Sequence, residues 1–165
     1  MEIRTATVTD AEALLVYATA LFAETLPGIF RRAVPTLEEE REFIGSRVEP
    51  TNSTMLVAVE ESAVIGLLDF VGEVLAEERH VGTLGLSVDR RWRGKGVGTE
   101  LVEALLVWAP TCGVSRIQIY CWENNPGAMR LYERIGFERE GVLRRAVIVD
   151  GEAIDVVLLA RSLDS

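Results

Sequence analysis

The chain has 165 residues, 48% of them apolar, and a formal net charge of −9 at pH 7, which suits one domain, residues 1–165, with a hydrophobic core of its own. The acidic balance argues against a nucleic-acid surface, which needs clustered Lys and Arg, and fits either solubility alone or attraction of a cationic substrate. No apolar run reaches the roughly 18 residues of a membrane span and the first residues lack the pattern of a secretion signal, so we expect a cytoplasmic protein without membrane contact.

The first half of the chain predicts one strand, two helices and then three strands. In chain order these are a strand at 2–8, a helix at 11–24, a helix from 37 through about 47, and strands at 54–60, 63–71 and 80–88. Thr9-Asp10 offers an N-cap for the first helix, and Thr36 with Glu39 has the spacing of a capping box for the second. Gly82 and Gly85 interrupt the last of these strands, and glycine inside a strand often marks a close approach by a ligand or another backbone.

The second half predicts a helix, a strand, a helix and two strands. A helix begins at Gly96 and ends before Pro110, a strand covers 114–122, and Asn125-Pro126 opens a helix that Gly136 closes. Asp150-Gly151 lies between two apolar runs and predicts a hairpin. The helical crossover between the strands at 80–88 and 114–122 requires them to be parallel. The fold class is therefore α/β: a mixed, mostly antiparallel sheet of about seven strands with a central parallel pair and helices on both faces.

The segment Arg93-Gly94-Lys95-Gly96-Val97-Gly98-Thr99 lies between a strand and a helix. A helix N-terminus with glycines before it can bind a phosphate through its free N–H groups. The phosphate-loop pattern fails because Gly96 follows Lys95, and the dinucleotide fingerprint fails because Thr99 or Leu101 stands where its third glycine belongs. The alternative is a glycine-rich turn without a ligand. We interpret the segment as a phosphate site.

Cysteine and histidine are too few for a metal site. Cys112 and Cys121 are the two cysteines, and His80 is the single histidine, so no metal-type spacing exists and no metal is expected. Cys121 falls in an alternating apolar stretch, which predicts a buried thiol rather than a disulfide.

Two motifs resemble a known family. Arg93-x-x-Gly96-x-Gly98 matches the R/Q-x-x-G-x-G/A signature of the GNAT superfamily of acetyl-CoA-dependent N-acetyltransferases, and the run from Asn125 to Phe137 resembles the family's second signature. With the order of elements, the resemblance covers nearly the whole chain. The tail is similar to the branch that contains amino-acid, phosphinothricin-type and ribosomal-protein-alanine acetyltransferases.

The resemblance implies acetyl-CoA as the cofactor. Its pyrophosphate would lie on the glycine-loop residues Arg93, Gly94, Lys95, Gly96, Val97, Gly98 and Thr99. Its pantetheine arm would pair with the backbone of Leu86 and Val88, between two parallel strands that splay apart. The N–H of Val88 would then polarise the thioester carbonyl. Asn125 would contact the arm or would only cap its helix.

The resemblance also implies direct attack by an amine, which must be neutral. A lysine-type amine is neutral in only about one molecule in 2,500 at pH 7, so a base has to remove its proton. His80 and Glu24 are the candidate bases, with ordered water as the alternative. Tyr132 matches the family's tyrosine that protonates the departing thiolate; its other interpretation is core packing.

The acceptor would enter between the first two helices and the last hairpin. Phe30 would form an apolar wall, and Asp155 would bind a cationic amine or pair with Arg144 or Arg145. The expected acceptor is a small amine, an amino acid or a polyamine; a protein N-terminus and a non-catalytic acyl-CoA-binding module are the alternatives. Family members are often dimers, so a homodimer is also considered.

Overall fold

A computed structural model of the protein describes residues 1–30 and 32–163. Its strands are β1 (Glu2–Thr5), β2 (Thr54–Glu60), β3 (Ala63–Gly72), β4 (Val81–Val88), β5 (Arg116–Trp122), β6 (Glu138–Val149) and β7 (Glu152–Ser162). Its α-helices are α1 (Ala11–Ala23), α2 (Leu37–Val48), α3 (Val97–Trp108) and α4 (Pro126–Arg134). The order of elements is the one that the sequence predicts. None of the helices in the described ranges is long and apolar enough to cross a membrane.

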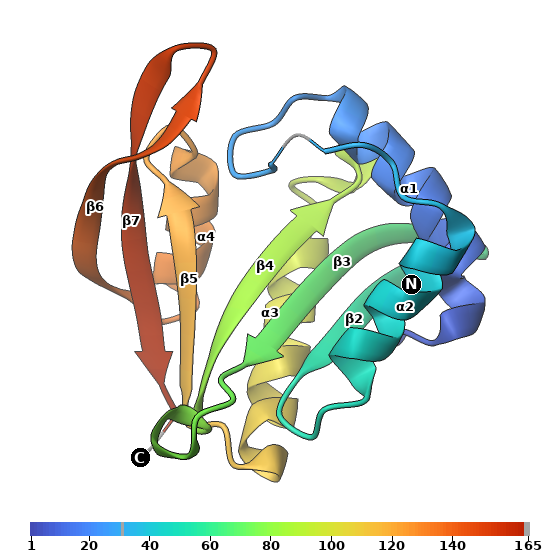
Figure 1. Ribbon diagram of the computed structural model, residues 1–165, viewed down its shortest axis with the longest axis horizontal. Coiled ribbons are helices and arrows are strands. Elements are labelled where there is room, and N and C mark those ends of the chain that lie inside the picture. The colour runs from blue at the N-terminus through green and yellow to red at the C-terminus, as the bar shows by residue number, and fades with distance from the viewer. Residues whose placement is uncertain (31, 164–165) are drawn as a thin grey trace.

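The seven strands form one sheet in the order β1-β2-β3-β4-β5-β7-β6. Among the strands of the described residues, β4 and β5 are the one parallel pair, and they pair over three positions, from Val81↔Arg116 to Thr83↔Gln118. Beyond Thr83 the two strands diverge, while β4 stays paired with β3 and β5 with β7 (Figure 1). The predicted splayed pair is confirmed, and it leaves one edge of β4 without a strand neighbour in the middle of the sheet.

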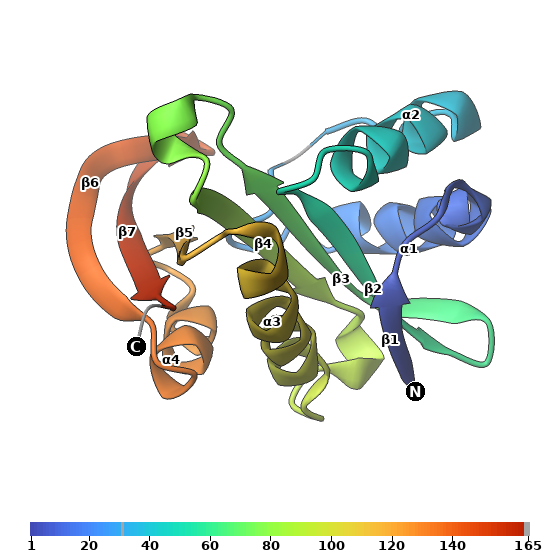
Figure 2. The same ribbon diagram turned by 90° about the horizontal axis from the view of Figure 1, so that it is seen from below.

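Helices cover both faces of the sheet, as predicted. The helices α3 and α4 lie on one face, and α1 and α2 lie on the other (Figure 2). A hydrophobic core lies on each face of the sheet, and strand β2 contributes to both because successive side chains of a strand point to opposite faces. Leu56 and Ala58 pack with the α3 side, whereas Met55 and Val57 pack with α1 and α2.

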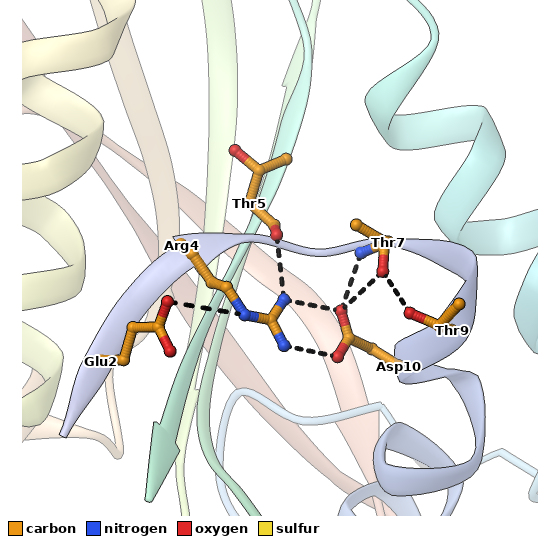
Figure 3. Close-up of polar contacts among 6 residues, drawn as sticks. All are labelled: Glu2, Arg4, Thr5, Thr7, Thr9 and Asp10. Atoms are coloured by element: carbon orange, nitrogen blue, oxygen red, sulfur yellow. Dashed lines mark hydrogen bonds and ion pairs between the residues drawn. The ribbon is translucent and has the colours of Figure 1, made fainter. Parts of the chain in front are cut away.

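The first strand is shorter than the predicted 2–8. It ends at Thr5, and Val8–Asp10 forms a 3-10 turn that leads into α1. The reason is Asp10, whose carboxylate accepts the backbone N–H of Thr7 at 2.8 Å and both terminal nitrogens of Arg4 at 2.8 and 2.7 Å (Figure 3). Asp10 is the N-cap residue of α1, as the sequence pattern suggested, but its side chain makes no capping hydrogen bond to that helix. It bonds Thr7 instead, and Thr7 is the N-cap residue of the 3-10 turn.

The β6–β7 hairpin confirms its turn signal. Asp150 and Gly151 form the two-residue loop, with φ angles of 50° and 83°, and positive φ at both positions is the backbone of a type I′ turn. The pairing of β6 with β7 is interrupted between Leu143 and Val147, where Arg145 also has a positive φ of 53°. This bulge bends β6, the edge strand of the sheet.

Candidate active site

A cavity of about 600 Å³ lies where β4 and β5 part, between the glycine loop, the start of α3 and α4. We call it the glycine-loop cavity. The predicted site residues that line it are Leu86, Val88, Arg93, Gly94, Gly96, Val97, Gly98, Thr99, Asn125 and Tyr132. Lys95 is not among the lining residues; its Nζ lies 5.1 Å from the ring centre of Trp92. The glycine-rich motif thus lies beside the place where β4 and β5 diverge.

The glycine loop has a backbone that only glycine adopts readily. Gly94 and Gly96 have φ angles of 71° and 90°, in the left-handed region where a Cβ causes strain. A Cβ at Gly98 would lie 3.3 Å from Leu131 and 3.4 Å from Leu86, so this glycine lets α3 pack closely on α4 and β4. The first helical hydrogen bond of α3 runs from Glu100 N to Gly96 O. The N–H groups before Glu100 have no helical partner and can face an anion.

Arg93 joins this loop to α1. Its two terminal nitrogens each donate to the Glu24 carboxylate at 2.8 Å, and its Nε donates to the carbonyl oxygen of Val88 at 2.9 Å. The Glu24 carboxylate raises the pKa of Arg93. Arg93 therefore fixes the end of β4 against the end of α1.

Tyr132 is a buried residue that lines the glycine-loop cavity. Only 3% of the residue is exposed, and its ring packs edge-on against Phe137 with centroids 5.6 Å apart. Among the described residues, no hydrogen bond to its hydroxyl is found, yet none of their buried side-chain oxygens or nitrogens lacks a partner. The hydroxyl must therefore reach the cavity surface. Burial raises the pKa of Tyr132, so the phenol keeps its proton at every ordinary pH.

Asn125 caps α4, which confirms one of its two interpretations. Its Oδ1 accepts the N–H of Ala128 at 3.3 Å, and its Nδ2 donates to the carbonyl of Pro27 at 3.4 Å. The side chain thus ties α4 to the loop after α1. Contact with a pantetheine arm stays a prediction.

A second cavity, of about 380 Å³, lies on the opposite face of the sheet between α1, α2, the loop that joins them, β3 and β4. We call it the α1–α2 cavity. Ile29, Leu86 and Ser87 line both cavities, so the two meet at β4. At this junction the buried Tyr17 hydroxyl donates to Ser87 Oγ at 2.8 Å. Neither Tyr17 nor Ser87 was predicted as a site residue from the sequence. The spacing of Tyr17 with Leu14 and Leu21 indicates a buried helix face, which predicts a core residue and no more.

Comparison with known proteins decides the family. Residues 18–137 match the family model described as "Acetyltransferase (GNAT) family". This chain belongs to the GNAT family. The resemblance drawn from the two sequence motifs is therefore confirmed.

Two curated relatives come from Escherichia coli (strain K12). The protein is 30% identical over 107 residues to L-amino acid N-acetyltransferase AaaT, covering 64% of this chain and 66% of the relative. It is 32% identical over 102 residues to [ribosomal protein uS5]-alanine N-acetyltransferase, covering 61% of this chain and 52% of that relative. The matches thus span between half and two thirds of the curated relatives.

Solved structures match over nearly the full chain. A GNAT-family acetyltransferase from Streptococcus pneumoniae superposes with a TM-score of 0.91 at 26% identity, covering 98% of each chain. A phosphinothricin acetyltransferase from Sinorhizobium meliloti, solved in complex with AcCoA, has a TM-score of 0.86 at 18% identity, covering 98% of this chain and 87% of that one. Because its sequence identity is only 18%, the second match shows a shared fold and nothing further.

In this member of the GNAT family, neither candidate base is placed favourably for proton removal from an amine. Glu24 is held by the two hydrogen bonds from Arg93, so its carboxylate is already engaged. His80 is exposed and precedes β4, where its carbonyl accepts the N–H groups of Ser115 and Arg116. It lies at the far end of the strand from Val88, about 26 Å away at roughly 3.3 Å per residue. These surroundings do not favour either residue as the base, and both assignments stay predictions.

The two predicted acceptor residues have different surroundings. Phe30 is 56% exposed, lines the α1–α2 cavity, and packs edge-on against Trp122 at 5.4 Å between ring centres. Asp155 instead accepts the backbone N–H of Arg145 at 2.7 Å. Asp155 thus pairs with Arg145 across the hairpin, as one of its two interpretations predicted, but through the backbone N–H of Arg145. This hydrogen bond lies at the bulge of β6. Asp155 lines neither of the two cavities.

Both cysteines are free, and Cys121 is buried as expected. In the part of the chain that the structure describes, no group of three or more His, Cys, Asp or Glu residues could hold a metal ion.

Proposed function

We propose that this protein transfers the acetyl group of acetyl-CoA to a primary amine of a small acceptor while both are bound. The observation that carries the proposal is the meeting of two cavities at Leu86 and Ser87, where β4 has lost its parallel neighbour. One cavity has the features of a phosphate site, and the other has a volume typical of small-molecule sites. The two reactants could thus approach each other from opposite faces of the sheet.

The residues present fit acetyl-CoA. The free N–H groups at the start of α3 would hold its pyrophosphate, and a Cβ at Gly94 would meet no atom within 4 Å, so the loop leaves room for an anion. The unpaired edge of β4 after Thr83 would pair with the amides of the pantetheine arm. When bound, acetyl-CoA supplies an activated acetyl thioester. The N–H of Val88 would donate to the thioester carbonyl as negative charge develops on its oxygen.

Tyr132 is the proposed general acid. The amine nitrogen forms a bond to the acetyl carbon, the carbon–sulfur bond breaks, and the departing sulfur takes the phenolic proton. Burial that raises the pKa of Tyr132 disfavours both a thiolate and a phenolate in this place. The proton released by the amine therefore returns to the phenolate through the cavity water, so that the thiol and Tyr132 both end neutral. We propose that water in the cavity accepts the proton of the amine, because Glu24 is engaged by Arg93 and His80 lies far away.

A small acceptor is favoured over a protein N-terminus. The α1–α2 cavity has about 380 Å³ and is walled by side chains of two helices, a loop and two strands. Such a volume suits a small molecule rather than an extended chain. We further propose a cytoplasmic location, which agrees with both cysteines being free. A homodimer remains a prediction.

Thiol release from acetyl-CoA tests the proposal. The purified protein is mixed with acetyl-CoA and, in turn, small primary amines, free amino acids and short peptides. We expect amine-dependent release with small amines or amino acids. Release with peptides alone would favour the protein acceptor, and acetyl-CoA binding without release for any amine would favour a non-catalytic module.

A further inference from the structure

Glu40 is a carboxylate turned into the protein. It belongs to the run Glu38-Glu39-Glu40 in the first turn of α2. Glu38 pairs with Arg41 on the surface at 3.6 Å, and Glu39 accepts the N–H of Thr36 at 2.7 Å as part of the capping box. Glu40 is only 7% exposed and lines the α1–α2 cavity. The helix thus directs one of three consecutive carboxylates into the proposed acceptor site.

Glu40 has no charge partner among the described residues. Within the described part of the chain it makes no ion pair and no side-chain hydrogen bond, and burial alone raises its pKa. Asp69 lines the same cavity but is bonded to Nε of Arg47 at 2.8 Å, and the charge of Arg32 also acts on the pKa of Asp69. A buried carboxylate without a partner is unfavourable. Its oxygens therefore keep some exposed surface, because no fully enclosed polar side-chain atom of the described residues lacks a partner, and Glu40 lines the cavity.

Apart from Arg32 and from Asp69, which is bonded to Arg47, the α1–α2 cavity has walls that suit an aliphatic chain. Between α2 and the junction at Ser87 the walls include Leu14, Phe22, Phe43 and Leu67. A methylene chain can pack on such side chains. At the junction the Tyr17–Ser87 hydroxyl pair offers a polar group to the reacting amine. The cavity therefore has a polar end at Ser87, apolar walls, and a carboxylate on α2.

We propose that Glu40 binds a second cationic group of the acceptor, so that the substrates are small amines carrying another ammonium or guanidinium group, such as α,ω-diamines. The inference rests on the acetyl transfer proposed above. The carboxylate would gain the partner that it lacks, and the charge of −9 would draw such cations to the molecule. Glu40 would determine specificity without touching the reacting atoms.

Matched amines test this assignment. The kcat/KM values for 1,4-diaminobutane and 1,5-diaminopentane are compared with those for n-butylamine and n-pentylamine, in the wild type, Glu40→Gln and Glu42→Gln. Glu42 is exposed on the same helix and is the control. We expect the wild type and Glu42→Gln to prefer the diamines by at least about tenfold. Glu40→Gln should lose that preference. Equal rates for diamines and monoamines in the wild type, or a preference for amino acids, would overturn the proposal.

Calorimetric binding of the same four amines, with coenzyme A present, separates this inference from the proposed activity. Preferential diamine binding that Glu40→Gln abolishes supports the site even if no acetyl transfer occurs. Transfer to monoamines and diamines alike, with no effect of Glu40→Gln, supports the activity and overturns the site. A thermal melt checks the fold, and Glu40→Gln should melt no lower than wild type because the substitution removes an unpaired buried charge.

Discussion

Tyr132 is the single side chain on which the proposed chemistry depends most. Its hydroxyl reaches the glycine-loop cavity, and burial keeps it protonated. We expect Tyr132→Phe to lower kcat by roughly 10²- to 10⁴-fold, the range of general acid catalysis, while acetyl-CoA still binds. Tyr120→Phe is the control because Tyr120 is 46% exposed on β5. Unchanged kcat in Tyr132→Phe would remove this residue from the mechanism.

Asp10 provides a test of stability and its pH dependence. Its hydrogen bonds from Arg4 are the largest cause that lowers the pKa of Asp10 in the folded protein (Figure 3). A lowered folded-state pKa gives stability that is present above the unfolded-state value of about 3.9 and is lost as the pH falls through the folded-state value.

We therefore expect Asp10→Asn to reduce the free energy of unfolding at pH 7 by about 1–3 kcal/mol, since it breaks bonds of a buried carboxylate. The difference from wild type should shrink as the pH is lowered from 5 to 2. Urea unfolding at several pH values measures it. Glu2→Gln, on the exposed side of the same guanidinium, should have little effect. A difference that stayed constant over this range would contradict the assignment.

Among the elements, the start of α3 is the one whose role can be tested most sharply. A Cβ at Gly96 meets nothing closer than Glu100 Oε1 at 4.0 Å, so Asp and Asn both fit there. Both also bear the strain of the 90° φ angle, and they differ mainly in charge. Two like charges about 4 Å apart near a protein surface repel by about 4 kcal/mol. Calorimetry should therefore show Gly96→Asp binding acetyl-CoA at least about tenfold more weakly than Gly96→Asn. Equal affinities would place the pyrophosphate elsewhere.

Local signals predicted the elements well, because each lies within a few residues of the structure that it forms. Asp150-Gly151 predicted the hairpin, Asn125-Pro126 the start of α4, and the glycine motif the loop before α3. The predicted end of β1 was wrong. The Asp10 carboxylate accepts hydrogen bonds from Thr7 and Arg4, and these bonds outweigh a weakly alternating pattern.

Contacts between distant segments were beyond such signals. Arg93 engages Glu24 across 69 positions, and Tyr17 bonds Ser87 across 70. Three consecutive glutamates begin α2, so the sequence does not distinguish Glu40 from the two before it. Its burial depends on how α2 packs on the rest of the protein. The glycine loop could be predicted from the sequence, whereas the partners of the candidate bases could not.

At the scale of the whole molecule, the sheet has one cavity on each face, and the two cavities share lining residues at β4. The helices α3 and α4 lie on one face and α1 and α2 on the other (Figure 2). One cavity lies on each side, and both are lined by Leu86 and Ser87 of β4, beyond the point where β4 leaves β5. The two reactants would therefore enter by separate openings and be bound together. Such an arrangement needs no covalent acetyl-protein intermediate.

Initial rates measured while acetyl-CoA and a turned-over amine are both varied test this claim most directly. The two adjacent cavities, which share Ile29, Leu86 and Ser87, predict that double-reciprocal plots at different amine concentrations intersect, as for a complex that holds both substrates. Parallel lines would contradict the account, because they would mean that the acetyl group passes first to a nucleophile of the protein and coenzyme A leaves before the amine reacts.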